Sequence, residues 1–408
     1  MKISQPAKNA AVIGSVCAFS YLVVYVARNI LGAVSPQMIE QGVLTTENIG
    51  SMSSVYFVTY AFGQLINGMI GDKIKTKYMI GFGLFLAGCS CMLIPLFASD
   101  SATVAYVSYG AMGFFLSMIY GPMTKAVAEN TDPRYTPRCS FGYTMSTLVG
   151  SPLAGLMAIF LAWNMSFWVG CAFLIFTGIL FFAVFAVLEK RGIVTYGRYR
   201  RTHCGAAGIR ELIRLQIIKF TLIAAVTGIV KTTVVSWLST YFSQHLGYSP
   251  ESAALLFTVC TTVISATVFI AMGLYALFRG NMSLVITVGF SAAALAVCGA
   301  YFFSHPIVNI VCVVIGVLGS NSASVMLWSL YCPSLRDTGM VSSVTGFLDF
   351  VSYMTGALAS YLSARAVDVI GWRWLLLIWC GLMVFGVVIS FFGKKKKEEE
   401  ISLPDGID

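Results

Sequence analysis

Charged residues and reactive side chains are scarce in this sequence. Asp, Glu, Lys and Arg make up 11% of its 408 residues, and 58% are hydrophobic, whereas about 25% of a soluble domain is charged. Only three histidines occur, and the 11 cysteines are scattered without the spacing of a metal site. Nucleotide-binding, zinc-binding and hydrolase motifs do not occur. The sequence therefore predicts neither an enzyme nor a resident metal or cofactor.

Long apolar runs fill most of the chain instead. The mean hydropathy is +0.82, and each run is long enough to cross ~30 Å of hydrocarbon as a helix. We therefore predict an all-α membrane protein with twelve transmembrane helices. The predicted spans are 10–35, 47–71, 77–98, 102–128, 138–161, 163–188, 215–243, 251–277, 281–303, 306–331, 338–366 and 370–392.

The basic residues gather on one predicted side of these spans. All but four of the 26 Lys and Arg residues fall in the termini, in every second loop or at the span ends beside them. Cytoplasmic loops of membrane proteins are rich in Lys and Arg, so we expect both termini in the cytoplasm. The net charge of +9 then indicates topology and contact with anionic lipid, not binding of nucleic acid. The short loops fit a multi-pass protein of a bacterial inner (plasma) membrane.

The spans form two sets of six, which predicts two pseudo-symmetric six-helix bundles. We expect the N-terminal bundle over 1–190, a cytoplasmic linker over 191–214, the C-terminal bundle over 215–393 and a cytoplasmic tail over 394–408. Substrate sites of transporters with such halves lie near the membrane midplane, between the repeats.

Two cations lie well inside predicted spans. Arg28 is in the first span and Lys231 is in the seventh, and their positions differ by 203 residues, half the chain. A charge in hydrocarbon costs several kcal/mol, and two like charges ~10 Å apart repel by roughly 1.7 kcal/mol at an effective dielectric of about 20. An anion bound between them removes that repulsion, so the pair predicts a small anionic substrate. Asp349, the one acid deep in a span, could instead neutralise one cation or carry a proton.

A loop motif places the chain in a superfamily. The stretch NGMIGDKIKTKY resembles the loop after the second helix of the major facilitator superfamily, in which a Gly-x-x-x-Asp-Arg/Lys pattern is followed by further basic residues. Gly68, Asp72, Lys73 and Lys77 fill this pattern. The resemblance implies the twelve-helix fold and a gating role for these four residues, in which an acid and its basic neighbours bridge the inner ends of helices in one state.

The first and seventh helices indicate a family. Residues 20–42 resemble the first helix of the organophosphate:phosphate antiporters, which exchange glycerol phosphate or hexose phosphates for inorganic phosphate. The phosphate-binding arginine of that family falls on Arg28, and two of its tyrosines fall on Tyr21 and Tyr25, which share a helix face with Arg28. The stretch GIVKTTVVSWLSTYF resembles the seventh helix, which puts Lys231 on the second cation of the family, an arginine in some members and a lysine in others.

Further candidates come from the second, fifth and eleventh helices. Tyr60 falls on a cavity tyrosine of the family, and TGFLDFVSYMTGALAS, which carries Asp349, resembles the eleventh helix of its sugar-phosphate branch. Gln64 and Thr147 stand where members carry a lysine and a histidine. They could contact the organic group or pack helices. Tyr120 could donate a hydrogen bond to phosphate or sugar, or serve as a packing aromatic.

These observations together predict a secondary active transporter. We expect it to exchange an organic phosphate ester of the sugar-phosphate kind for inorganic phosphate by alternating access, and to act as a monomer in the lipid bilayer. Two alternatives stay open, a proton-coupled symporter of organic carboxylates such as sugar acids, and a sensor of the same fold that binds phosphate esters without moving them. A pore is a third and is disfavoured by the duplication around buried charges.

Overall fold

The computed structural model describes residues 4–197, 206–303 and 305–392, and the regular secondary structure in these ranges is helical throughout. The predicted tail over 394–408 and part of the predicted linker lie outside the described residues. From the N-terminus the helices are α1 (Gln5–Glu40), α2 (Thr46–Gly71), α3 (Thr76–Phe97), α4 (Ala102–Asn130), α5 (Thr136–Thr144), α6 (Ser146–Phe160), α7 (Trp163–Lys190), α8 (Ala206–Arg214), α9 (Ile217–Ile229), η1 (Val230–Val234), α10 (Val235–Gln244), α11 (Pro250–Ser265), α12 (Thr267–Leu277), α13 (Met282–Phe302), α14 (Pro306–Met326), η2 (Leu327–Tyr331), α15 (Cys332–Ser334), η3 (Leu335–Thr338) and α16 (Val341–Phe391).

The helices follow the predicted spans closely. Within the described ranges, ten helices or helix runs are long and apolar enough to cross a membrane. The remaining two predicted spans, 47–71 and 338–366, are occupied by α2 and by the first part of α16, which are also helical. At Gly371 (φ 75°, ψ 169°) the backbone of α16 leaves the helical conformation, so α16 supplies the last two spans as two legs. Glycine reaches this φ without a steric penalty.

The chain folds as two compact units. Unit 1 comprises residues 1–202 and 332–350, and unit 2 comprises 203–331 and 351–408. The segment 332–350 comes from the second half of the sequence, yet it packs within unit 1. Helix α16 therefore begins in unit 1 and continues in unit 2, and each unit is described by itself below.

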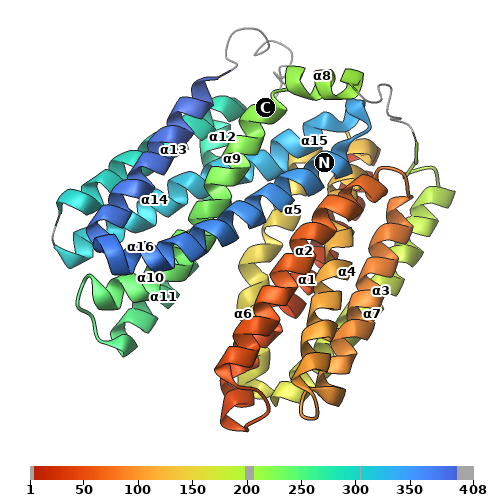
Figure 1. Ribbon diagram of the computed structural model, residues 1–408. Coiled ribbons are helices and arrows are strands. Elements are labelled where there is room, and N and C mark those ends of the chain that lie inside the picture. Colours follow the sequence, from red (N-terminus) through yellow and green to blue (C-terminus); the bar gives the residue numbers. More distant parts are fainter. Residues whose placement is uncertain (1–3, 198–205, 304, 393–408) are drawn as a thin grey trace. The chain divides into compact units, whose positions relative to one another are not determined.

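Small residues set the helix crossings of unit 1. Helices α1, α2, α3, α4, α6 and α7 run side by side (Figure 1). A Cβ atom at Gly178 of α7 would lie 2.8 Å from the carbonyl oxygen of Gly81 of α3, so these helices approach each other at glycine. Membrane helices without a hydrophobic driving force between them gain from such close packing.

Unit 2 also brings helices together at glycine, and two of its helices are interrupted by π-helical turns, η1 and η2. Helix α13 packs on α14, and a Cβ atom at Gly289 would lie 2.7 Å from the carbonyl oxygen of Gly319. The seventh predicted span is formed by α9 and α10, which are joined by the π-helical turn η1. Such π turns are rare in helices and are frequently found at functional sites.

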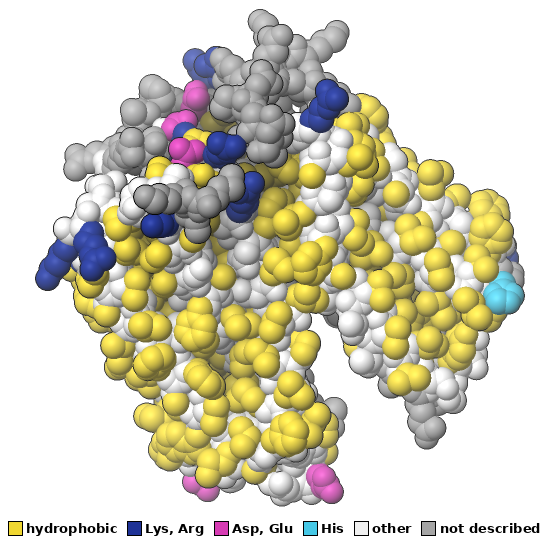
Figure 2. Space-filling model, turned by 180° about the vertical axis from the view of Figure 1, so that it is seen from behind, with side chains coloured by type: hydrophobic (Ala, Val, Ile, Leu, Met, Phe, Trp, Pro, Cys, Tyr) yellow, Lys and Arg dark blue, Asp and Glu magenta, His cyan; other side chains and the backbone are white. Residues whose placement is uncertain are grey.

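The surface of unit 1 has an apolar girdle and a basic end. On the face shown in Figure 2, hydrophobic side chains cover the length of unit 1, and Lys and Arg side chains gather at one of its ends. Exposed apolar side chains such as Phe160 (79% exposed) and Phe176 (58%) suit a lipid-facing surface. The distribution agrees with a multi-pass membrane protein.

Candidate functional site

Arg28 lies on α1 among aromatic rings of unit 1. Its guanidinium carbon lies 5.3 Å from the ring centres of Phe57 and Tyr60, 5.7 Å from that of Tyr25 and 5.9 Å from that of Tyr56. The face of each ring attracts a cation, by about 0.5–2 kcal/mol depending on desolvation. The rings therefore offset part of the cost of a guanidinium at membrane depth.

The tyrosines predicted to share a face with Arg28 continue this aromatic cluster. The ring centres of Tyr21 and Tyr25 are 5.1 Å apart. Tyr21 also stacks on Tyr120 of α4 at 5.3 Å and meets Tyr143 of α5 edge-on at 6.1 Å. Unit 1 thus brings together five of the predicted site residues. Their role in binding a ligand stays a prediction.

Asp349 belongs to the same cluster. It is half-buried in the part of α16 that packs in unit 1, and its carboxylate interacts electrostatically with Tyr21 and Tyr120. Lys231 belongs to unit 2, so a pairing of Asp349 with Lys231 stays a prediction. A role for Asp349 in carrying a proton likewise stays a prediction.

Lys231 lies in the π-helical turn η1 of unit 2 and its side chain is exposed. The hydroxyl of Thr232, next in the chain, donates to the carbonyl oxygen of Gly228 at 2.7 Å. The second part of α16 presses on this turn, because a Cβ atom at Gly356 would collide with the Thr232 hydroxyl. Helix α16 therefore packs closely on the turn that carries Lys231.

Matching hydrogen bonds fix the register of the internal repeat. In unit 1 the indole Nε1–H of Trp163 donates to Oε1 of Gln41 at 2.9 Å. In unit 2 the indole Nε1–H of Trp372 donates to Oε1 of Gln244 at 3.1 Å. The first bond joins the end of the first predicted span to the start of the sixth, and the second joins the end of the seventh to the start of the twelfth, so the two glutamines occupy equivalent places.

The same register relates the two buried-span cations. Gln41 follows Arg28 by as many residues as Gln244 follows Lys231. The positions of the cations therefore correspond in their respective units, as the 203-residue spacing predicts. Whether the two side chains reach one ligand stays a prediction.

The predicted gating aspartate contacts the start of α16. The two carboxylate oxygens of Asp72 accept the backbone N–H groups of Ser342, at 2.9 Å, and Ser343, at 2.8 Å. A carboxylate is favoured at a helix N-terminus, where unpaired N–H groups and the helix dipole meet it. Burial raises the pKa of Asp72, and the hydrogen bonds from Ser343 and the nearby Lys125 charge counter part of that rise.

Gly68 and a lysine complete this contact. A Cβ atom at Gly68 would lie 2.8 Å from the carbonyl oxygen of Ser342 and 3.0 Å from Cα of Gly346, so the approach of α16 to α2 at this place requires glycine. The ammonium of Lys125, a buried residue, donates to the carbonyl oxygens of Gly71 at 3.2 Å and Asp72 at 2.8 Å. It satisfies the C-terminal carbonyls of α2, a role that sequence reasoning missed.

The basic residues of the motif divide into two kinds. Lys77 pairs with Glu189 of α7 at 2.5 Å, and Lys75 pairs with the other oxygen of the same carboxylate at 2.8 Å. Lys73 is exposed. An acid at the end of a span in basic surroundings is a signal that could have identified Glu189 from the sequence.

Gln64 is fully buried at the crossing of α2 and α16. Neither its Oε1 nor its Nε2 has a hydrogen-bond partner among the described residues. A Cβ atom at Gly346 of α16 would collide with the backbone carbonyl oxygen of Gln64. The side chain of Thr147, in α6, lies outside the described part of the chain. Sequence reasoning missed Tyr56, Phe57 and Tyr109 around Arg28, and Tyr143 beside Tyr21.

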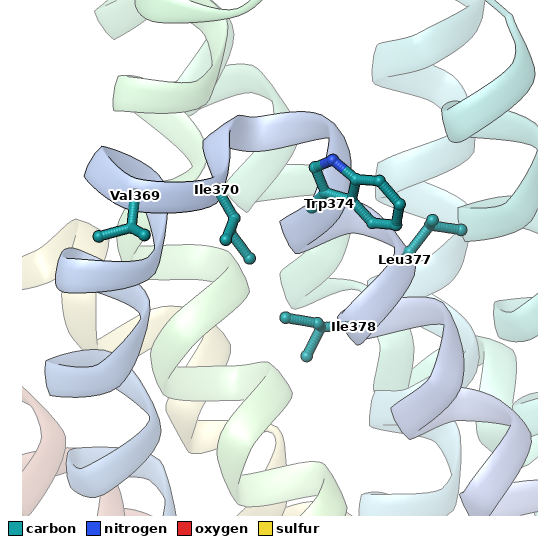
Figure 3. Close-up of a pocket in the computed structure, with 5 residues that line it drawn as sticks. All are labelled: Val369, Ile370, Trp374, Leu377 and Ile378. Atoms are coloured by element: carbon teal, nitrogen blue, oxygen red, sulfur yellow. The ribbon is translucent and has the colours of Figure 1, made fainter.

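An apolar hollow of about 510 Å³ lies in unit 2, where α16 breaks. Figure 3 shows Ile370 and Ile378 projecting into the angle between the two legs of α16. The other lining residues are Val369, Trp374 and Leu377. None of the predicted site residues lines this hollow, and none of its five lining residues is charged.

A sequence model of the Major Facilitator Superfamily matches residues 17–360. The protein therefore belongs to this superfamily of membrane transporters, which confirms the predicted superfamily, the all-helical fold and the prediction that the chain is not an enzyme. The outward-conformation structure of FucP, a member of the superfamily, superposes with a TM-score of 0.74 at 14% identity, over 94% of this chain and 98% of that one. The likeness confirms the fold.

Similar individual proteins indicate where this chain lies within the superfamily. The chain is similar to the membrane sensor protein UhpC of Salmonella typhimurium, with 22% identity over 390 aligned residues, covering 87% of this chain and 84% of that protein. It is 24% identical to the glycerol-3-phosphate transporter of Bacillus subtilis over 381 residues, covering 86% and 84%. It is 22% identical to the phosphoglycerate transporter protein of Salmonella typhimurium over 385 residues, covering 86% and 82%. These matches confirm a distant relationship to the organophosphate transporters.

Proposed function

We propose that the protein carries an organic phosphate ester across the membrane in exchange for inorganic phosphate. The observation that carries this proposal is Arg28, a guanidinium held by four aromatic rings on the helix that resembles the phosphate-binding helix of the family. A guanidinium binds phosphate through two parallel hydrogen bonds, and neighbouring tyrosine hydroxyls supply further donors. The names of two relatives, a glycerol-3-phosphate and a phosphoglycerate transporter, support the same substrate class.

The proposed cycle is alternating access. Arg28 and the equivalent Lys231 bind the phosphoryl group, and its charge offsets theirs when the carrier closes. An empty carrier would close over uncompensated cations, so exchange is favoured over net movement. The contact of Asp72 with the N-terminus of α16 supplies a latch that stabilises one arrangement and is released in the other.

Counterflow tests this function. Proteoliposomes loaded with inorganic phosphate should take up labelled glycerol 3-phosphate or glucose 6-phosphate without a pH gradient, and liposomes without internal phosphate should not. Arg28→Ala should abolish uptake. Arg138→Ala is the matched control, because Arg138 is an exposed arginine of the same unit whose guanidinium carbon lies 6.0 Å from the ring centre of Tyr135. If uptake requires a proton gradient and the transported solute is a carboxylate, the exchange proposal is overturned in favour of symport.

A sensor is the second candidate function. Its support is that the relatives include the membrane sensor protein UhpC of two bacteria. A sensor binds a phosphate ester without flux, so it would show saturable binding in detergent and no counterflow. Binding and counterflow measured on one preparation separate the two functions.

A further inference from the structure

Tyr109 of α4 contacts Arg28 at its backbone. The Tyr109 side chain is buried (3% exposed), and its hydroxyl donates to the carbonyl oxygen of Arg28 at 3.0 Å. Inside a helix that carbonyl already accepts the N–H group four residues further on, and its second lone pair is free for another donor. The Tyr109 hydroxyl therefore ties α1 to α4 at the residue that carries the guanidinium.

The ring of Tyr109 contacts Arg28 indirectly as well. Its centre lies 4.8 Å from that of Tyr56, and the Tyr56 ring lies under the Arg28 guanidinium at 5.9 Å. Tyr56 in turn stacks on Tyr60 at 5.9 Å. One residue of α4 thus supports both the backbone of Arg28 and the aromatic surface on which its side chain rests.

The next turn of α4 makes room for this arrangement. A Cβ atom at Gly113 would lie 2.8 Å from the carbonyl oxygen of Tyr56 and 3.0 Å from its ring. Glycine at this place lets α2 approach α4 closely enough for the rings of Tyr56 and Tyr109 to meet. The Tyr56 ring therefore contacts both helix α4 and the Arg28 guanidinium.

We propose that Tyr109 is a positioning residue that fixes the Arg28 guanidinium for anion binding. It does not touch the ligand. It acts by holding the backbone of Arg28 and the Tyr56 ring against which the guanidinium lies, so that less conformational freedom is left to lose when an anion binds. The proposal rests on the proposed function for its ligand, and on the geometry of unit 1 for its mechanism.

The test compares two tyrosines of α4. Tyr109→Phe keeps the ring contact with Tyr56 and removes the hydroxyl bond to Arg28. Tyr106→Phe removes a comparable bond, from the Tyr106 hydroxyl to Oδ1 of Asn48 at 2.6 Å, which does not involve Arg28. One net hydrogen bond corresponds to about a threefold to tenfold change in an equilibrium constant. We therefore expect both variants to lower the melting temperature similarly.

Binding of inorganic phosphate should separate them. Calorimetry on the purified full-length chain should show a dissociation constant about threefold to tenfold higher for Tyr109→Phe, and an unchanged one for Tyr106→Phe. In transport assays the change should fall on KM and leave kcat unaltered. Equal phosphate affinity in both variants and the wild type, with Arg28→Lys impaired, would overturn the positioning role and leave the proposed function standing.

A second readout needs no ligand. Phenylglyoxal modifies arginine side chains, and peptide mass spectrometry follows the rate at Arg28 alone. Tyr109→Phe should raise that rate and Tyr106→Phe should not. If the wild type binds no phosphate, the proposed function fails, while this rate still decides whether Tyr109 holds Arg28. Identical rates in the wild type and in Tyr109→Phe would overturn the inference.

Discussion

Trp163 donates a hydrogen bond from its indole N–H to the side-chain oxygen of Gln41 at 2.9 Å, and it does so at the same place in unit 1 as Trp372 does in unit 2 with Gln244 at 3.1 Å. In each unit the bond links the end of the span that carries the cation to the start of the last span of that half of the chain. Two halves that share so specific a contact share a packing plan, which supports reading Arg28 and Lys231 as corresponding positions.

Replacing either tryptophan by phenylalanine should weaken its own unit. Trp163→Phe and Trp372→Phe each keep the ring and lose the N–H donor, which costs about 1 kcal/mol and lowers the melting temperature by about 2–4 °C. Differential scanning fluorimetry measures the shift. Trp374→Phe is the control, since that side chain is 60% exposed and should melt like the wild type. Equal melting of all three variants would refute the structural role of the pair.

Arg28 and Lys231 should differ in how well each tolerates replacement by the other basic residue. Arg28→Lys keeps the charge and loses both the planar fork and the best ring contacts, so phosphate affinity should fall at least about tenfold. Lys231→Arg should retain most activity, because Lys231 leaves its π turn with an exposed side chain. Titration calorimetry with inorganic phosphate compares the two variants, and comparable losses in both would contradict the assignment of the anchoring role to Arg28.

Replacing Gly68 of the loop motif by alanine should disturb the packing of α2 against α16. Gly68→Ala puts a Cβ atom against the backbone of α16, and such overpacking costs about 1–3 kcal/mol. We expect slower counterflow and a lower melting temperature. Gly50→Ala on the same helix is the matched control, because a Cβ atom there meets nothing within 4 Å. A Gly68→Ala protein that behaves like Gly50→Ala would show that α16 does not need this close approach.

Hydropathy was sufficient to predict the helices, because the bilayer requires long apolar segments whatever their partners. It could not predict that α16 begins in unit 1. That outcome depends on contacts of Asp72 and Gly68 with residues about 270 positions later in the chain. A single sequence contains no signal for such long-range pairs.

Only the residues of the candidate site that lie on one helix could be predicted to lie together. Tyr21, Tyr25 and Arg28 lie on one helix, so spacing alone puts them on one face. Tyr56 and Tyr109 reach Arg28 from two other helices, and only the packing of α2 on α4 brings them there. The π turn at Lys231 was not predicted either, and α16 packs closely on it through Gly356.

The contact of Asp72 with α16 should be visible in hydrogen exchange. Asp72→Asn keeps one acceptor oxygen and loses the charge, and hydrogen bonds to a charged group contribute about 1.5–3 kcal/mol against about 1 kcal/mol for neutral ones. The amides of Ser342 and Ser343 should therefore exchange several-fold faster, as measured by mass spectrometry of a peptide over 341–350 in nanodiscs. Asp132→Asn is the control, because the carboxylate of Asp132 accepts from the N–H of Arg134 in an exposed turn, and it should leave that peptide unchanged. If exchange of the peptide is equally slow in both variants, the carboxylate of Asp72 does not hold the start of α16, and the latch in the proposed cycle must be sought elsewhere.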